Sequence, residues 1–72
     1  MSRYQVRITE IGNPANTRVV DPLAHRARSV LSMLAVSAGA DYIVHTPTER
    51  LPLGIVRADG SAKWDPMMPQ LS

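Results

Sequence analysis

The segment LGIVRADGSAKW, residues 53–64, decides the fold because it places a strong turn signal between two apolar runs. The dipeptide Asp59-Gly60 favours a type I′ turn, in which both central residues have positive φ. A two-residue turn sets the register, so Ile55 is predicted to face Trp64. Side chains alternate across a strand, which puts four apolar residues on one face: Leu53, Ile55, Ala62 and Trp64. Trp64 is the only tryptophan in a chain without phenylalanine, so we expect this face to be buried.

Three further strands are predicted, the first of them from period-two alternation of apolar and polar residues. Near the beginning of the chain the inward set is Tyr4, Val6 and Ile8. A turn cluster of Gly, Asn and Pro follows at residues 11–16, and residues 17–20 return as a second strand. Asp41–His45 is predicted as a third strand.

A helix is predicted between the second and third strands. Asp21 is suited to accept hydrogen bonds from the free N–H groups of a first turn, and Pro22 fits the first helical position. The helix should continue to about Ala38, with Gly39 as a left-handed C-terminal cap. Its apolar stripe comprises Leu23, Ala27, Val30, Leu31, Leu34 and Ala38.

The element order is therefore ββαβββ, which predicts an α+β fold with a single helix packed on a curled antiparallel sheet of about five strands. We expect one domain over residues 1–65. Residues 66–72 are predicted to form a C-terminal tail, in which two adjacent methionines could dock on the domain.

Composition narrows the class of protein. A chain of 72 residues without cysteine has neither disulfides nor a thiolate metal site. No apolar run approaches about 18 residues, and no signal-peptide core is recognisable, so we expect a cytoplasmic protein. The net charge is +2, and every basic residue except Lys63 is arginine, which suits carboxylate or phosphate partners.

Residue types that carry catalysis are sparse. His25 and His45 are the only histidines, and two imidazoles without a spaced carboxylate trio make a poor zinc site. The serines near His25 share its helix face without an oxyanion element, and the glycines do not form a phosphate loop. We therefore expect no catalytic residues, no metal and no cofactor, and we predict that the chain is not an enzyme.

Two surfaces are predicted to bind partners. The outward side of the sheet should form a basic patch of Arg3, Arg7, Arg18 and Lys63. The alternative is that these charges only protect a solvated sheet edge against aggregation. The second surface is on the helix, where the predicted contacts are Arg26, Arg28 and Met33. The outward helix face lacks Glu and Lys, so either the curled sheet or tail covers it, or another protein does.

The helix and last hairpin carry a motif. Arg26-Ala27-Arg28 lies on the helix, and the hairpin reads Ile55-Val56-Arg57-Ala58-Asp59-Gly60, then Lys63-Trp64 and Asp65. From Thr17 to Asp65 the chain resembles small phage- and prophage-encoded proteins that include anti-CRISPR inhibitors of type I surveillance complexes. It departs from them by one extra residue after Gly60, few lysines and a more apolar helix. The resemblance implies an inhibitor that binds the backbone subunits of a Cascade-type complex in the host cytoplasm and obstructs target DNA.

The leading hypothesis is a small interaction protein that blocks a larger nucleic-acid-processing assembly. A second is a nucleic-acid-binding module that uses the basic sheet face, although such sheets normally stack bases on exposed aromatic residues. A third is a homodimer or larger homo-oligomer that associates through the helix face. No membrane partner is expected.

Overall fold

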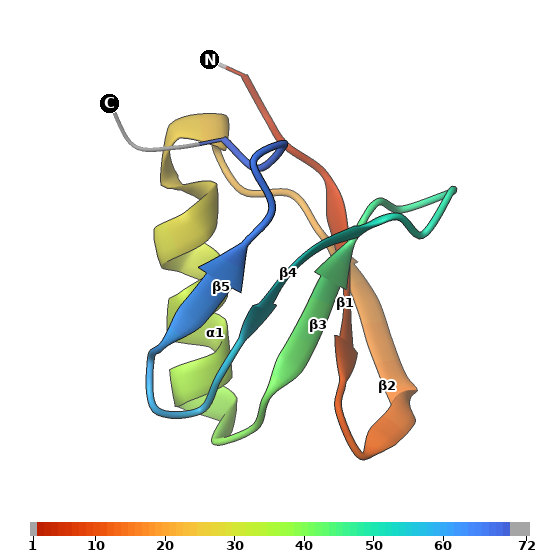
Figure 1. The fold of residues 1–72 in the computed structure, drawn as a ribbon, viewed down its shortest axis with the longest axis vertical. Helices are drawn as coiled ribbons and strands as arrows, with labels where there is room; N and C mark the ends of the chain where they lie inside the picture. The colour runs from red at the N-terminus through yellow and green to blue at the C-terminus, as the bar shows by residue number, and fades with distance from the viewer. Residues whose placement is uncertain (1, 70–72) are drawn as a thin grey trace.

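The computed structural model describes residues 2–69 as two layers, a five-stranded sheet and one helix (Figure 1). The elements are β1 (Val6–Glu10), β2 (Asn13–Val20), η1 (Ala24–Arg26), α1 (Ala27–Ala38), β3 (Tyr42–His45), β4 (Pro52–Val56) and β5 (Ala62–Trp64). The sheet order is β2-β1-β3-β4-β5, and every neighbouring pair is antiparallel. The predicted α+β class and the order ββαβββ are confirmed.

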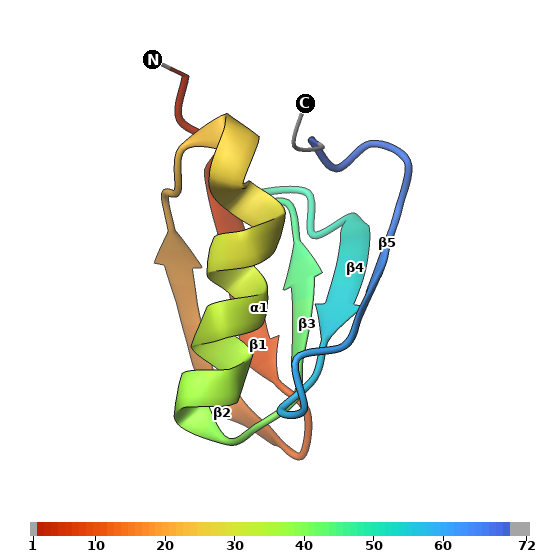
Figure 2. The same cartoon turned by 90° about the vertical axis from the view of Figure 1, so that its left-hand side faces the viewer.

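The helix α1 covers one side of the sheet, which we call the inner face (Figure 2). Val6 and Ile8 point to this side and are fully buried, as predicted. On the helix, Ala27 and Leu31 are buried as predicted, but Ala35 completes the buried stripe in place of Ala38. The core consists of Val6, Ile8, Ala27, Leu31, Ala35, Tyr42, Val44, Leu53, Val56 and Met68.

The β4–β5 hairpin differs from the prediction by one residue in register. Ile55 faces Lys63, and Gly54 faces Trp64. The N–H of Arg57 donates to the Ser61 carbonyl at 2.9 Å, and the N–H of Gly60 donates to the Arg57 carbonyl at 2.9 Å. With Gly60 at φ +91°, this is a three-residue loop in which a turn is followed by a left-handed glycine. The predicted two-residue type I′ turn is wrong.

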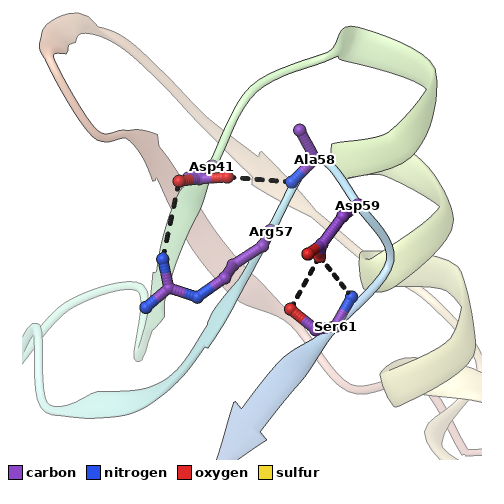
Figure 3. Close-up of polar contacts among 5 residues, drawn as sticks. All are labelled: Asp41, Arg57, Ala58, Asp59 and Ser61. Carbon is purple, nitrogen blue, oxygen red and sulfur yellow. Dashed lines mark hydrogen bonds and ion pairs between the residues drawn. The ribbon is translucent and has the colours of Figure 1, made fainter.

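Side-chain hydrogen bonds favour this longer loop (Figure 3). One carboxylate oxygen of Asp59 accepts from the N–H of Ser61 at 2.9 Å and from its hydroxyl at 2.7 Å. Asp41 accepts from the N–H of Ala58 at 2.8 Å and forms an ion pair with Arg57 at 3.7 Å. A type I′ turn would require positive φ at Asp59, whereas the observed loop needs it only at Gly60.

The register shift changes which side chains lie on the inner face. Trp64 is half-buried there, with its ring over Gly54 and packed against the core. Ile55 pairs with Ile43 and points to the opposite side of the sheet, so its predicted burial beside Trp64 is wrong. Ala62 is exposed, which also differs from the prediction, whereas Leu53 is fully buried.

The helix begins later than predicted because the segment before it pairs with the beginning of the chain. The N–H of Tyr4 donates to the Pro22 carbonyl at 2.8 Å, and the N–H of Ala24 donates to the Ser2 carbonyl at 2.9 Å. These extended contacts occupy backbone groups that a helix beginning at Pro22 would use, so Asp21 is not its cap. The predicted C-terminal cap is confirmed, since Gly39 has φ +65°.

The β1–β2 hairpin is longer than predicted. Its tight turn is formed by Ile11 and Gly12, and Glu10 faces Asn13 directly across it. The register then shifts, so part of the predicted turn cluster belongs to β2 as an irregular stretch. Asn16 lies in this stretch and donates its side-chain N–H to Glu10 at 2.9 Å, which holds the irregular stretch against β1.

The segment after β5 packs on the domain as far as residue 69. Met68 is only 1% exposed and belongs to the core, and its carbonyl accepts from Arg28 at 2.9 Å. The folded unit therefore extends beyond Asp65, where we expected a tail to begin, and one of the two adjacent methionines docks. The remainder of that expected tail, residues 70–72, lies outside the described residues, as does residue 1.

Replacing Gly54 by alanine should destabilise the fold by about 2 kcal/mol, because the new Cβ would meet closely packed atoms. It would lie 2.6 Å from both the Lys63 carbonyl oxygen and Cε3 of the Trp64 ring. Urea unfolding measures the loss, with the exposed helix substitution Ser37→Ala as a control that should stay within about 0.5 kcal/mol of the parent. Equal stability of Gly54→Ala and the parent would contradict the observed packing.

The turn at Asp59 should make stability depend on pH. Hydrogen bonds first from the Ser61 hydroxyl and then from its backbone N–H lower the pKa of Asp59 from its ordinary 3.8. A lowered folded-state pKa stabilises the fold above the unfolded-state value and loses that effect as pH falls through the folded value. Asp59→Asn keeps an acceptor but cannot titrate. In urea unfolding at about pH 6 the parent should be more stable than this variant, and at about pH 2.5 the difference should shrink. A difference that stays constant with pH would refute this role.

Candidate partner-binding surface

The side of the sheet turned away from α1, which we call the outer face, has no helix over it in the part of the chain that the structure describes (Figure 2). The strand registers align one row of side chains across four strands: Thr9, Ile43, Ile55 and Lys63. Ile43 is 39% exposed at the centre of this row, and Val19 is exposed on β2. Apolar surface is therefore left open to solvent beside polar neighbours.

A shallow depression of about 410 Å³ lies over β3, β4 and β5. Its lining residues are Ile43, Pro52, Gly54, Ile55, Lys63, Trp64 and Asp65. The lining is mainly apolar and carries one charge of each sign. Its size is at the lower end of the range typical of ligand pockets, but its shape is open, which suits a protruding side chain better than an enclosed small molecule.

Two cations on this face have no acidic partner within residues 2–69. Arg57 and Asp41 form the one ion pair within residues 2–69, so neither Arg7 nor Lys63 is neutralised by a carboxylate there. The Nε–H of Arg7 donates to the Pro47 carbonyl at 3.3 Å, which orients its guanidinium without neutralising its charge. Asp65 does share the depression with Lys63, but one of its oxygens accepts from the N–H of Met67 at 2.9 Å.

His45 lies on the same face beside Arg7 but is only 8% exposed, and both ring nitrogens have partners. Nδ1 is 3.2 Å from the Thr46 carbonyl, which can only accept, so Nδ1 carries a proton. Nε2 is 3.1 Å from the hydroxyl of Thr9, which in turn is 3.0 Å from that of Thr17. A hydroxyl–imidazole pair can serve nucleophilic catalysis, but neither partner here lines the depression.

Other groups give little support for catalysis or metal binding. Among residues 2–69, no cluster of three or more His, Asp or Glu side chains is placed to hold a metal ion. His25 is exposed in η1, on the helix side of the domain.

The structure does not bring the predicted sheet patch into one cluster. Arg7 and Lys63 are on the outer face as expected, separated by β3 and β4. Arg18 pairs with the buried Ile8, so its side chain is directed to the inner face at the edge strand. Arg3 precedes β1 and donates to the Asp21 carbonyl at 3.1 Å.

The predicted helix surface is also divided. Arg26 is exposed at the end of η1, and Met33 is 69% exposed on α1. Within residues 2–69, neither the sheet nor the segment after β5 covers the outward helix face, where Met33 and Val36 are exposed. Arg28, in contrast, is half-buried, with its guanidinium carbon 5.7 Å from the centre of the Trp64 ring.

Sequence reasoning missed the apolar lining of the depression, because the predicted register placed Ile55 in the core. A three-residue loop around the same Asp-Gly dipeptide would have set Ile55 opposite Lys63 and on the outer face. The sequence signal that could have favoured that loop is an Asp at position 59, because an Asp side chain readily accepts from the backbone N–H two residues on, here that of Ser61.

Comparisons with known proteins found no matching family model, no similar curated protein and no similar solved structure. No helix within the described residues is long and apolar enough to cross a membrane.

Arg28 should contribute to stability rather than act only as a free surface cation. It stacks on Trp64 and donates to the Met68 carbonyl, so Arg28→Gln should cost about 1 kcal/mol in urea unfolding and alter the fluorescence of Trp64. The matched control is Arg26→Gln, which removes an exposed arginine two residues away and should change stability by less than about 0.5 kcal/mol. Equal effects of the two substitutions would contradict this assignment.

Proposed function

We propose that this chain is a small non-enzymatic interaction protein that binds a protein partner through the outer face of its sheet. The observation that carries the proposal is a sheet face that no other part of residues 2–69 covers, with exposed Ile43 and half-buried Ile55 flanked by two cations that lack acidic partners within those residues. Apolar surface rimmed by polar groups is typical of protein contact sites. Charges at the rim add specificity and accelerate encounter.

Binding through the face is favoured over strand addition at an edge. The edge strand β2 contains Pro14, which has no N–H to donate, and Arg18, whose charge is directed inward. The other edge strand, β5, has three residues and is soon followed by Pro66. Short edges, proline and inward charges are the devices by which proteins prevent strand addition.

A protein partner is favoured over a nucleic acid because the outer face offers no stacking platform among residues 2–69. Tyr42 is 5% exposed and belongs to the core, while Tyr4 and Trp64 are half-buried and pack against it. Proteins that bind single strands on a sheet rely on exposed aromatic rings. The two free cations alone would give weak, salt-sensitive binding to phosphates.

The resemblance of residues 17–65 to anti-CRISPR proteins gives the proposal a specific form. A Cascade-type complex presents a large protein surface, and an inhibitor that works by occupying such a surface needs no catalytic residues. We therefore propose that the chain docks on such a complex and blocks its binding to target DNA.

The test uses a purified Cascade-type complex and the parent chain with two charge-introducing variants. Ile43→Glu alters the outer face, whereas Met33→Glu alters the exposed helix face. Binding is measured with the complex immobilised on a surface, and inhibition is measured as the loss of target-DNA capture. Ile43→Glu should weaken binding at least tenfold, and Met33→Glu should behave as the parent. Circular dichroism confirms that each variant is folded.

Other results of this experiment would contradict the proposed contact face or the proposed partner. Loss of binding with Met33→Glu alone would place the contact on the helix, and absence of binding by the parent would remove the Cascade-type complex as the partner. Binding of random DNA with a log–log salt slope of about −0.9 per contacted phosphate would instead support the nucleic-acid alternative.

A further inference from the structure

The two cations of the outer face that lack acidic partners within residues 2–69 lie on opposite sides of its apolar centre. Arg7 is on β1 and Lys63 on β5, three strand spacings apart in the sheet order. At about 4.8 Å for each spacing, they are separated by about 14 Å across the strands. Ile43 on β3 and Ile55 on β4 share one row with Lys63 and line the depression, whereas Arg7 pairs with His45 and is offset from that row by two residues, about 7 Å along the strands.

An extended polypeptide matches this spacing. Its side chains at positions i, i+2 and i+4 point to one side, and these positions span about 13 Å. A segment that lies across the strands can therefore present a carboxylate to Arg7, an apolar side chain to the depression, and a second carboxylate to Lys63. Because of the offset of about 7 Å along the strands, the segment crosses the sheet diagonally, and the long side chains of Arg7 and Lys63 take up the remaining distance.

We propose that the outer face recognises an extended protein segment of the pattern acidic–x–apolar–x–acidic, with its central side chain seated in the depression. This inference rests on the proposed function, since it names the partner chemistry of the same face. Charge complementarity selects the acidic residues, because Arg7 and Lys63 have no carboxylate partner within residues 2–69. The apolar lining selects the central residue.

The other charged groups on this side are compatible with such a segment. Asp41 and Arg57 neutralise each other at the end of the sheet near the β4–β5 loop. Asp65 borders the depression, and the Met67 N–H occupies one of its oxygens, which leaves the other able to accept a backbone N–H of the bound segment. His45 is engaged at both nitrogens and does not compete for the carboxylates.

The probe is the blocked peptide Ac-Asp-Ala-Leu-Ala-Asp-NH2, titrated into the ¹⁵N-labelled full chain at low salt. Amide shifts should map to Ile43, Ile55 and Lys63. Three matched peptides dissect the pattern. Asparagine in place of both aspartates, or alanine in place of leucine, should each weaken binding at least fivefold. Lysine in place of both aspartates should abolish the shifts.

Variants of the chain test the two cations. Lys63→Gln and Arg7→Gln should each weaken binding of the acidic peptide at least threefold and bring it towards that of the asparagine peptide. The matched control is Arg26→Gln, which removes the same charge from the helix side and should leave the titration unchanged. Amide spectra without peptide verify that each variant keeps the fold.

Three results would overturn the inference: no shifts on the outer face, equal affinity for the aspartate and asparagine peptides, or shifts confined to α1. A single-stranded oligonucleotide that shifts the same residues more strongly than the peptide would also overturn it, in favour of phosphate binding. The proposed function fails separately, because the Ile43→Glu comparison on an intact partner complex does not use the peptide. If Ile43→Glu lost binding to the partner complex while the parent bound no peptide, the outer face would remain the contact site and the acidic–x–apolar–x–acidic pattern would be rejected.

Discussion

The contact on which the rest of the molecule depends is the packing of the Trp64 ring between Gly54 and Arg28. The ring lies against the glycine backbone on one strand, and the guanidinium of α1 lies over the ring. Arg28 also binds the carbonyl of Met68, whose side chain fills the core. One cluster therefore joins β4, β5, the helix and the segment that follows β5. In a chain of 72 residues with three aromatic residues, few other side chains are large enough to make such a connection.

Packing the core on one side of the sheet leaves the other side available for binding. A 12-residue helix is about 18 Å long and covers the inner face only. The outer face is built from β-branched and polar side chains, such as Val19, Thr9 and Ile43, which suit a strand whether or not it is covered. Its residues consequently contribute less to the core than those of the inner face. A surface of this kind can be altered for a partner without dismantling the fold.

The architecture could be predicted from the sequence because its signals are local. Alternation located Val6 and Ile8 on the inner face, and Gly39 marked the end of the helix. The register of the last hairpin could not be predicted in the same way, since an Asp-Gly dipeptide suits both a two-residue and a three-residue loop. The choice depended on hydrogen bonds from Ser61 to Asp59. Likewise, the late start of the helix depended on pairing with residues 2–4, which no local pattern reveals.

The register error carried over to the candidate site and concealed its apolar lining, whereas Arg7 and Lys63 were correctly predicted on the outer face. The lack of acidic partners for these two cations within residues 2–69 could not be predicted, because the fold decides in which loops and turns the acidic residues are engaged. The carboxylates of Asp41 and Asp65 accept backbone N–H groups in loops, and that of Asp59 holds its own turn. Arg7 and Lys63 have no such carboxylate partners within the described part of the chain. The potential of this face thus follows from where the turns place the acids, and composition alone contains no such information.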